Sequence, residues 1–223
     1  MYGNRISDCF YLKNPRQTDL GLRIIRSASS QIEALGFSSV TLKKIASDIG
    51  SVEASVYRYF ENKEHLLFYL LSDYWSIVEL KLEIARLQGN TPIEKVFNSI
   101  DVLFGTDDLA LKGLAADVDL KTLRPIARKY FYFALSLLQD SPTDLQVEMY
   151  KKFQTHLVNI REDLAKDLKV ILPNFSSVSL LCDTILNESL YSTQELQLSG
   201  LDPEKDGYKK LGSYLKELIA RIR

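Results

Sequence analysis

Residues 41–63 read TLKKIASDIGSVEASVYRYFENK, and this stretch decides the fold of the N-terminal part of the chain. It contains two short helical segments, one on each side of Gly50. A small residue, Ala46, stands where two crossing helices come closest, and glycine tolerates the positive φ that a tight turn requires. The inward-facing residues that complete the pattern are Ile45, Ile49 and Val56. This spacing predicts a helix-turn-helix, with its second helix running from about Val52 to Phe60.

The rest of the chain also has the pattern of helices and not of strands. Glycine (10) and proline (6) are scarce, and most of them stand where an amphipathic segment ends. The apolar residues from Leu20 to Leu35 recur three and four apart, with Thr18 or Asp19 as N-cap and Gly36 as C-cap. A break is expected near Pro125. The other predicted helices cover residues 63–87, 91–104, 106–120, 126–138, 142–172, 176–198 and 204–223.

An all-α fold of nine or ten helices follows from this pattern. We expect a helix-turn-helix domain over residues 1–62, with an N-terminal arm over 1–17, and a larger helical domain over 63–223. The helix that begins after Asn62 joins the two domains.

Charge is distributed unevenly along a chain that is nearly neutral overall, with 28 Lys and Arg against 29 Asp and Glu. Residues 1–63 contain nine basic and six acidic side chains, and the remainder contains nineteen basic and twenty-three acidic ones. A polyanion is therefore expected to prefer the N-terminal part.

Cysteine usage and hydropathy indicate a cytoplasmic protein. Cys9 and Cys182 are far apart and too few for a disulfide framework. The first ten residues, MYGNRISDCF, do not form a charged-then-apolar leader. No apolar run reaches the roughly 18 residues that a membrane span needs.

From Ile45 onward, the run IASDIGSVEASVYRYFENKEHLL resembles the signature of the TetR family of transcriptional regulators. Gly36-Phe37 and Thr41 also fall where that family places a turn and a helix cap. The residues that match in register are Ile45, Ala46, Gly50, Tyr57, Tyr59, Phe60, Lys63, Glu64 and Leu66. One departure concerns the start of the second helix, where Ser51-Val52 inverts the usual Val-Ser order. The side-chain N-cap is expected to be lost there, at a cost of about 0.5–2 kcal/mol, unless Ser51 caps from one position earlier.

The resemblance implies a ligand-responsive repressor that binds a palindromic operator as a homodimer and is released by an unidentified small molecule. The alternative is a helical ligand- or partner-binding protein that kept the fold and lost operator recognition. The modest basic excess and the Ser51-Val52 inversion favour that alternative. No cofactor is implied by either reading.

The helix after Gly50 buries Val56 and Phe60, which leaves its other face for DNA. Arg58 is expected to bind guanine or a phosphate, and Tyr57 resembles the family's phosphate-contacting tyrosine. Lys63 stands at a helix N-terminus, where it and the free N–H groups can share one phosphate. The full set of predicted DNA contacts is Thr41, Lys43, Lys44, Glu53, Ala54, Ser55, Tyr57, Arg58 and Lys63. The alternative for Glu53 and Arg58 is a solvated side chain that makes no contact with DNA.

The N-terminal arm carries three further basic residues, Arg5, Lys13 and Arg16. They either reach a minor groove or belong to a frayed terminus.

Predictions for the larger domain are less specific. The aromatic residues that can line an apolar ligand pocket, or equally form ordinary core, are Trp75, Phe97, Phe104, Tyr130, Phe133, Tyr150 and Phe153. The resemblance implies a dimer interface on the last two helices, and the apolar stripe that fits it, or equally forms ordinary core, is Leu180, Leu181, Ile185, Leu215, Leu218 and Ile219. His65 and His156 have no partners at metal-ligand spacing, and we find no grouping of catalytic residues, so neither a metal site nor an enzyme is expected.

Overall fold

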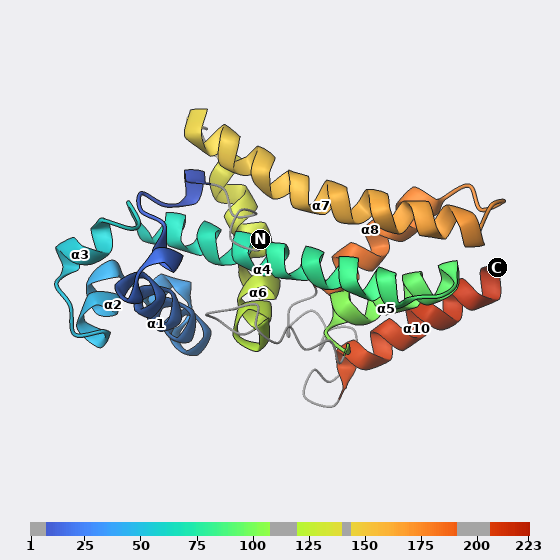
Figure 1. The fold of residues 1–223 in the computed structure, drawn as a ribbon, viewed down its shortest axis with the longest axis horizontal. Helices are drawn as coiled ribbons and strands as arrows, with labels where there is room; N and C mark the ends of the chain where they lie inside the picture. Colours follow the sequence, from blue (N-terminus) through green and yellow to red (C-terminus); the bar gives the residue numbers. More distant parts are fainter. Residues whose placement is uncertain (1–7, 108–119, 140–143, 191–205) are drawn as a thin grey trace. The chain divides into compact units, whose positions relative to one another are not determined.

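The computed structural model describes residues 8–107, 120–139, 144–190 and 206–223, and over these residues the chain is all-helical, with nine α-helices and no strand (Figure 1). The helices are α1 (Asp19–Leu35), α2 (Leu42–Asp48), α3 (Glu53–Tyr57), α4 (Lys63–Gln88), α5 (Pro92–Phe104), α6 (Leu120–Gln139), α7 (Asp144–Ile171), α8 (Val178–Ser189) and α10 (Gly207–Ile222). Short 3-10 turns η2 (Asp8–Phe10), η3 (Pro15–Gln17) and η4 (Phe37–Ser39) flank α1. None of the described helices is long and apolar enough to cross a membrane. The all-α fold class is confirmed.

Side-chain caps fix the starts of several helices. Thr18, Thr41 and Thr91 cap α1, α2 and α5, since each hydroxyl oxygen accepts a hydrogen bond from the backbone N–H three residues on, at 3.1–3.3 Å. Asn62 does the same for α4 at 2.8 Å. Gly36 ends α1 with φ at +79°, a backbone conformation that glycine adopts without strain.

Contacts divide the chain into two compact units, one within Met1–Ser76 and Lys112–Phe153 and the other within Ile77–Leu111 and Gln154–Arg223. Helices α4 and α7 each contribute residues to both units. The functional boundary expected between residues 62 and 63 remains a prediction.

The first unit holds the three N-terminal helices together with α6, which packs against α1. Its core is aromatic. Phe131 makes edge-to-face contacts with Trp75 and Phe153, at ring-centroid distances of 5.6 and 6.3 Å. The break predicted near Pro125 is wrong, because α6 runs through this residue. Burial of the neighbouring Ile126 on the core face outweighs the hydrogen bond that proline cannot donate.

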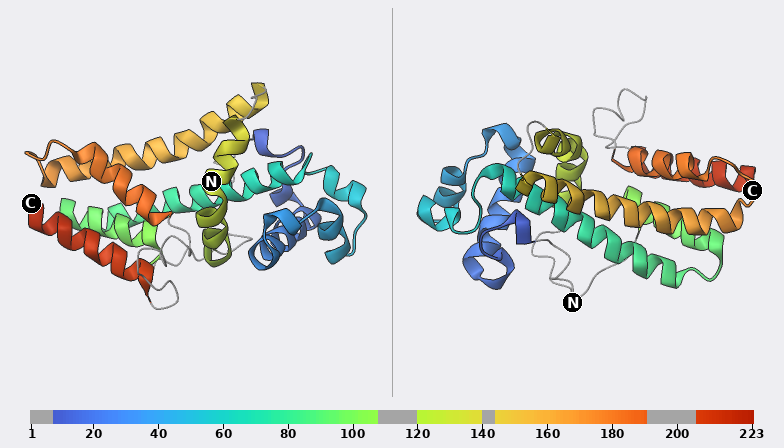
Figure 2. Two further views of the ribbon diagram at one scale, coloured as in Figure 1. Left: turned by 180° about the vertical axis from the view of Figure 1, so that it is seen from behind. Right: turned by 90° about the horizontal axis from the view of Figure 1, so that it is seen from above.

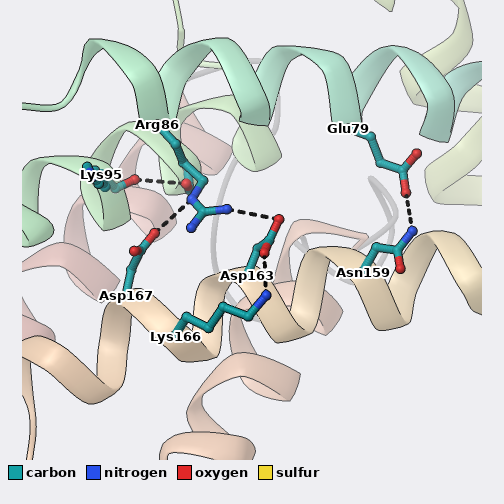
Figure 3. A network of polar contacts seen from close by, with 8 residues as sticks. Glu79, Arg86, Lys95, Asn159, Asp163, Lys166 and Asp167 are labelled. Carbon is teal, nitrogen blue, oxygen red and sulfur yellow. Dashed lines mark hydrogen bonds and ion pairs between the residues drawn. The ribbon is translucent and has the colours of Figure 1, made fainter.

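The second unit is a helical bundle in which α5, α8 and α10 contact one another (Figure 2). Polar contacts join the parts of α4 and α7 that belong to this unit (Figure 3). Arg86 of α4 binds Asp163 at 2.9 Å and Asp167 at 2.8 Å, and the Asn159 amide donates to Glu79 at 3.5 Å. Most of the helix predicted over 106–120 lies outside the described residues, as does the end of the one predicted over 176–198.

Candidate DNA-binding surface

The helix-turn-helix has the geometry that its spacing predicts. Helices α2 and α3 contact each other, and α1 packs against α2. Gly50 adopts φ of +62° in the turn, and the Ser51 N–H donates to the Ala46 carbonyl at 2.8 Å. Ala46 and Val56 are buried, so the small residue and the inward valine lie in the core of the three-helix unit.

The first turn of α3 lacks a side-chain cap. Val52 occupies the N-cap position with an extended backbone, and no side chain accepts from the helix N-terminus. Its own carbonyl accepts from the Ser55 N–H at 2.9 Å. Ser51 therefore does not take over the capping role, and α3 is short, beginning at Glu53 and ending at Tyr57.

One face of α3 is open to solvent. Ala54, Tyr57 and Arg58 are exposed, while Glu53 and Ser55 are half-buried. Tyr59 and Phe60 are buried, as expected of core residues. The structure thus places all five predicted α3 contacts away from the core or at its margin, where a DNA groove can reach them.

The remaining predicted contacts lie at helix starts, and Thr41, Lys44 and Lys63 have partners within the protein. Thr41 caps α2, and Lys43 is exposed beside it. The Lys44 ammonium donates to the Ser39 carbonyl at 2.6 Å. The Lys63 ammonium lies 3.4 Å from the Phe37 carbonyl and 4.6 Å from the centroid of the Phe37 ring. An ammonium group has three N–H donors, so each lysine can keep its carbonyl contact and also donate to a phosphate.

The N-terminal arm is neither frayed over its described residues nor free for a minor groove. The Arg16 guanidinium binds both carboxylate oxygens of Asp73 on α4, at 2.6 and 2.7 Å, and this carboxylate is fully buried. The Lys13 ammonium lies 5.2 Å from the centroid of the Tyr59 ring. Arg5 lies outside the described residues. Sequence reasoning missed this docking because partners 57 residues apart leave no local pattern.

Two of the predicted pocket residues instead brace the turn after α1. The Tyr130 hydroxyl accepts a hydrogen bond from the Phe37 N–H at 2.9 Å. Phe133, which is 43% exposed, packs against the Phe37 ring at 5.8 Å. Tyr130 and Phe133 thus support the DNA-binding unit from α6, a role that no sequence motif signals.

The other predicted pocket residues are divided between the two compact units. Trp75 and Phe153 meet in the aromatic core of the first unit through Phe131, and Tyr150 is half-buried on α7. Phe97 and Phe104 belong to the second unit, where Phe104 is buried and Phe97 lies under the Lys216 ammonium.

The predicted dimer residues fall into two groups. Leu181, Ile185, Leu215 and Ile219 are buried in the core of the second unit, which agrees with the ordinary-core alternative, and the dimer interface stays a prediction. They are buried because α8 and α10 direct their most apolar faces at each other and at α5. Leu218 is half-buried, and Leu180 is 66% exposed on the outer face of α8.

No group of three or more metal-ligating side chains occurs in the described part of the chain. His156 instead pairs with Glu79, with Nδ1 3.0 Å from the carboxylate, and both side chains are largely buried. His65 is half-buried at the start of α4. Burial lowers the pKa of His65, and the nearby Glu61 and Glu64 oppose that shift.

Comparisons with known proteins agree with this geometry. Residues 24–70 match the family model of bacterial regulatory proteins of the tetR family. Curated protein sequences contain no match to the chain. A regulatory protein in the tetR family from Rhodococcus RHA1 has a similar structure, with a TM-score of 0.60 and 13% identity over 90% of this chain and 94% of that one.

Two solved regulators named FadR also have this fold. The fatty acid degradation regulator FadR from Bacillus halodurans gives a TM-score of 0.59 and 20% identity, covering 88% of this chain and 92% of that one. FadR from Bacillus subtilis, solved in complex with stearoyl-CoA, gives 0.59 and 18%, covering 91% and 98%. Residues 24–70 are therefore similar to the bacterial regulatory proteins of the tetR family, and the chain shares the helical fold of these solved regulators.

Proposed function

We propose that this protein is a cytoplasmic transcriptional repressor that binds a palindromic operator as a homodimer and leaves it when a small molecule binds. The observation that carries DNA binding is the division of α3 into two faces. Val56 and Phe60 hold the helix on the core, while Ala54, Tyr57 and Arg58 are exposed beside the α2 lysines. A helix exposed in this way can enter a major groove and read base edges.

Selection from a random double-stranded 20-bp library tests operator binding. The protein is expected to enrich a palindromic sequence, and its affinity for that duplex should fall steeply with salt because phosphate binding releases counterions. Arg58→Ala should weaken binding by about 1–3 kcal/mol if Arg58 binds a base. Arg221→Ala is the matched control, since Arg221 is a highly exposed arginine of α10.

Failure to enrich any sequence at low salt would reject the repressor. It would leave the alternative of a ligand- or partner-binding protein that lost operator recognition.

The effector that we propose is an acyl thioester, such as a long-chain acyl-CoA. The solved B. subtilis FadR holds stearoyl-CoA, and this chain has its fold. In the first unit, the Ser72 hydroxyl and the Trp75 indole N–H are buried on α4 and have no hydrogen-bond partner among the described residues. Aromatic rings of Phe131 and Tyr74 contact the Trp75 ring. Buried donors among apolar rings suit a carbonyl that ends an acyl chain.

Trp75 makes this proposal directly measurable because it is the only tryptophan in the chain. Stearoyl-CoA should change its fluorescence saturably, and free coenzyme A should not. Trp75→Phe removes the N–H but keeps an aromatic ring, and Ser72→Ala removes the second donor. Each should weaken stearoyl-CoA binding, measured by calorimetry, by about 1–3 kcal/mol. Equal binding by both variants and the unaltered protein would place the ligand elsewhere.

For the homodimer we propose the outer faces of α8 and α10. Leu180 and Tyr214 are large side chains that are 66% and 60% exposed there. Leu180→Glu should convert the dimer to a monomer in light scattering, while Val170→Glu, at a comparably exposed site on α7, should not. A monomeric unaltered protein at micromolar concentration would reject this part of the proposal.

A further inference from the structure

The segment before α1 is docked along the DNA-binding unit. We call residues 8–17, with their turns η2 and η3, the N-terminal strap (dark blue in Figure 1). At its start, Phe10 is fully buried and its ring contacts that of Phe153 edge to face at 5.4 Å. The neighbouring Tyr11 ring lies 6.0 Å from that of Tyr69 on α4. The strap therefore begins anchored in the aromatic core of its unit.

A buried ion pair anchors the other end of the strap. Arg16 of η3 is bidentate to Asp73, whose carboxylate is inaccessible to solvent. Removing either partner of such a pair leaves a charge without compensation, so the pair fixes the strap firmly even where its net contribution to stability is small.

The strap crosses α1 at a position that only glycine permits. A Cβ on Gly21 would lie 2.1 Å from the Pro15 carbonyl oxygen and 2.5 Å from the Pro15 Cα. Both are backbone atoms, so no side-chain rotation relieves this clash. Gly21 is helical, and alanine would itself favour the helix by about 1 kcal/mol. The glycine is therefore explained by the close approach of the strap and not by α1.

Between its two anchors the strap contacts Tyr59, which lies two residues beyond the end of α3, the proposed recognition helix. The Leu12 N–H donates to the Tyr59 carbonyl at 2.8 Å, and the Lys13 ammonium lies over the Tyr59 ring. Just beyond the strap, the Thr18 and Tyr59 hydroxyl groups are 2.7 Å apart and share a hydrogen bond. The strap and Thr18 therefore hold, by a backbone hydrogen bond and two side-chain contacts, the residue that directly follows the C-cap of α3.

We propose that the N-terminal strap positions the recognition helix, with the Leu12 backbone N–H, Arg16 and Gly21 as its positioning groups. Tyr59 directly follows Arg58 and lies two residues after Tyr57, so a fixed Tyr59 backbone sets where both exposed side chains point. Helix α3 needs this external support because it is one of the shortest described helices and has no side-chain cap at its start. The effect of the strap on DNA affinity rests on the proposed function, whereas its effect on the order of α3 does not.

Hydrogen exchange tests the positioning without any DNA. Leu12→Pro removes the donor to Tyr59, and Leu12→Ala is the matched control, because the Leu12 side chain is 64% exposed and makes little contact. In Leu12→Pro the amides of residues 58–60 should exchange about fivefold faster than in the control, as expected for one lost hydrogen bond. Equal exchange in the two variants would overturn the proposal.

Gly21→Ala displaces the whole strap, and Gly212→Ala is its control, because a Cβ there meets only ordinary contacts at 3.4 Å and beyond. Affinity is measured for the duplex that the unaltered protein selects and for a scrambled duplex of equal length. Gly21→Ala should lose roughly tenfold in affinity for the selected duplex and keep its affinity for the scrambled one, since phosphate attraction does not depend on the pose of α3.

The two duplexes separate positioning from simple destabilisation. Partial unfolding lowers both affinities by the same factor, which would overturn the strap's role, as would a Gly21→Ala variant that binds like Gly212→Ala. If the unaltered protein selects no duplex at all, the operator proposal falls, and the exchange comparison at residues 58–60 still decides whether the strap orders α3.

Discussion

Replacing Val52 with serine should stabilise the recognition helix. Val52 holds the N-cap position of α3 with φ of −88° and ψ of 146°, and its side chain is 68% exposed. The threonine caps of α1, α2 and α5 have a similar extended backbone. A serine hydroxyl can therefore reach the helix N–H groups without a change of backbone conformation.

The structure limits the size of this effect. A serine cap contributes about 0.5–2 kcal/mol in general. Here the Ser55 N–H already donates to the Val52 carbonyl at 2.9 Å, which leaves the hydroxyl mainly the N–H of Ala54. We therefore expect the lower half of the range, about 0.5–1 kcal/mol. Val52→Ala is the matched control, because it removes the same methyl groups and adds no hydroxyl.

Amide hydrogen exchange is the appropriate assay, since a chain with two compact units need not unfold in one step. In Val52→Ser the Ala54 amide should exchange about two- to fivefold more slowly than in Val52→Ala. If exchange at Ala54 is the same in both variants, a side-chain cap adds no stability to the first turn of α3. The Ser51-Val52 inversion would then cost the helix nothing, contrary to the expectation.

Three further changes have defined outcomes. Tyr130→Phe leaves the Phe37 N–H without its acceptor and should lower the free energy of unfolding by about 1–3 kcal/mol in urea titrations. Arg86→Leu breaks the contacts with two aspartates of α7 and should cost about 1 kcal/mol, less at high salt because these groups are partly exposed. His65 has a lowered pKa in the folded protein, so the unfolded chain binds its proton more readily. Stability should therefore fall as pH drops below about 6.5 towards the folded pKa, and His65→Gln should flatten that part of the profile.

Each of these has a control. Tyr57→Phe and Arg221→Leu alter exposed side chains of the same types and, in the absence of DNA, should change stability little. A Tyr130→Phe protein as stable as Tyr57→Phe would show that water satisfies the Phe37 N–H. An Arg86→Leu effect that is independent of salt would point to lost packing and not to charge. For His65, an unchanged pH profile in the glutamine variant would assign the acid sensitivity to another group.

Local signals in the sequence predicted those parts of the fold that depend on neighbouring residues. The caps at Thr18, Thr41 and Asn62 were predictable because a capping oxygen acts three residues along the chain. The helix-turn-helix was predictable because Ala46, Gly50 and Val56 meet a steric requirement at fixed spacing. The continuation of α6 through Pro125 was not predictable, since the burial of that helix outweighs the local penalty of proline.

Some residues of the candidate site could likewise be placed from the sequence, and others could not. Exposure of Tyr57 and Arg58 followed from helical periodicity, whereas the aromatic residues gave no basis for deciding between pocket and core. Tyr130, expected in a pocket, instead binds Phe37 across 93 residues of sequence. Leu181 and Ile185 fitted a dimer interface or ordinary core equally well, because an apolar stripe does not reveal which helix covers it, and they lie in the chain's own core.

By itself, the sequence determined an all-helical chain with a helix-turn-helix near its N-terminus and identified the exposed face of the recognition helix. Only the tertiary structure decided what holds that helix in place. Arg16 looked like an arm residue for DNA, and its burial against Asp73 turned it into an anchor. Gly21 looked like an unremarkable residue of α1, and the approach of Pro15 showed why no side chain fits there. Periodicity and spacing describe one element at a time, whereas these contacts join residues that meet only when the chain is folded.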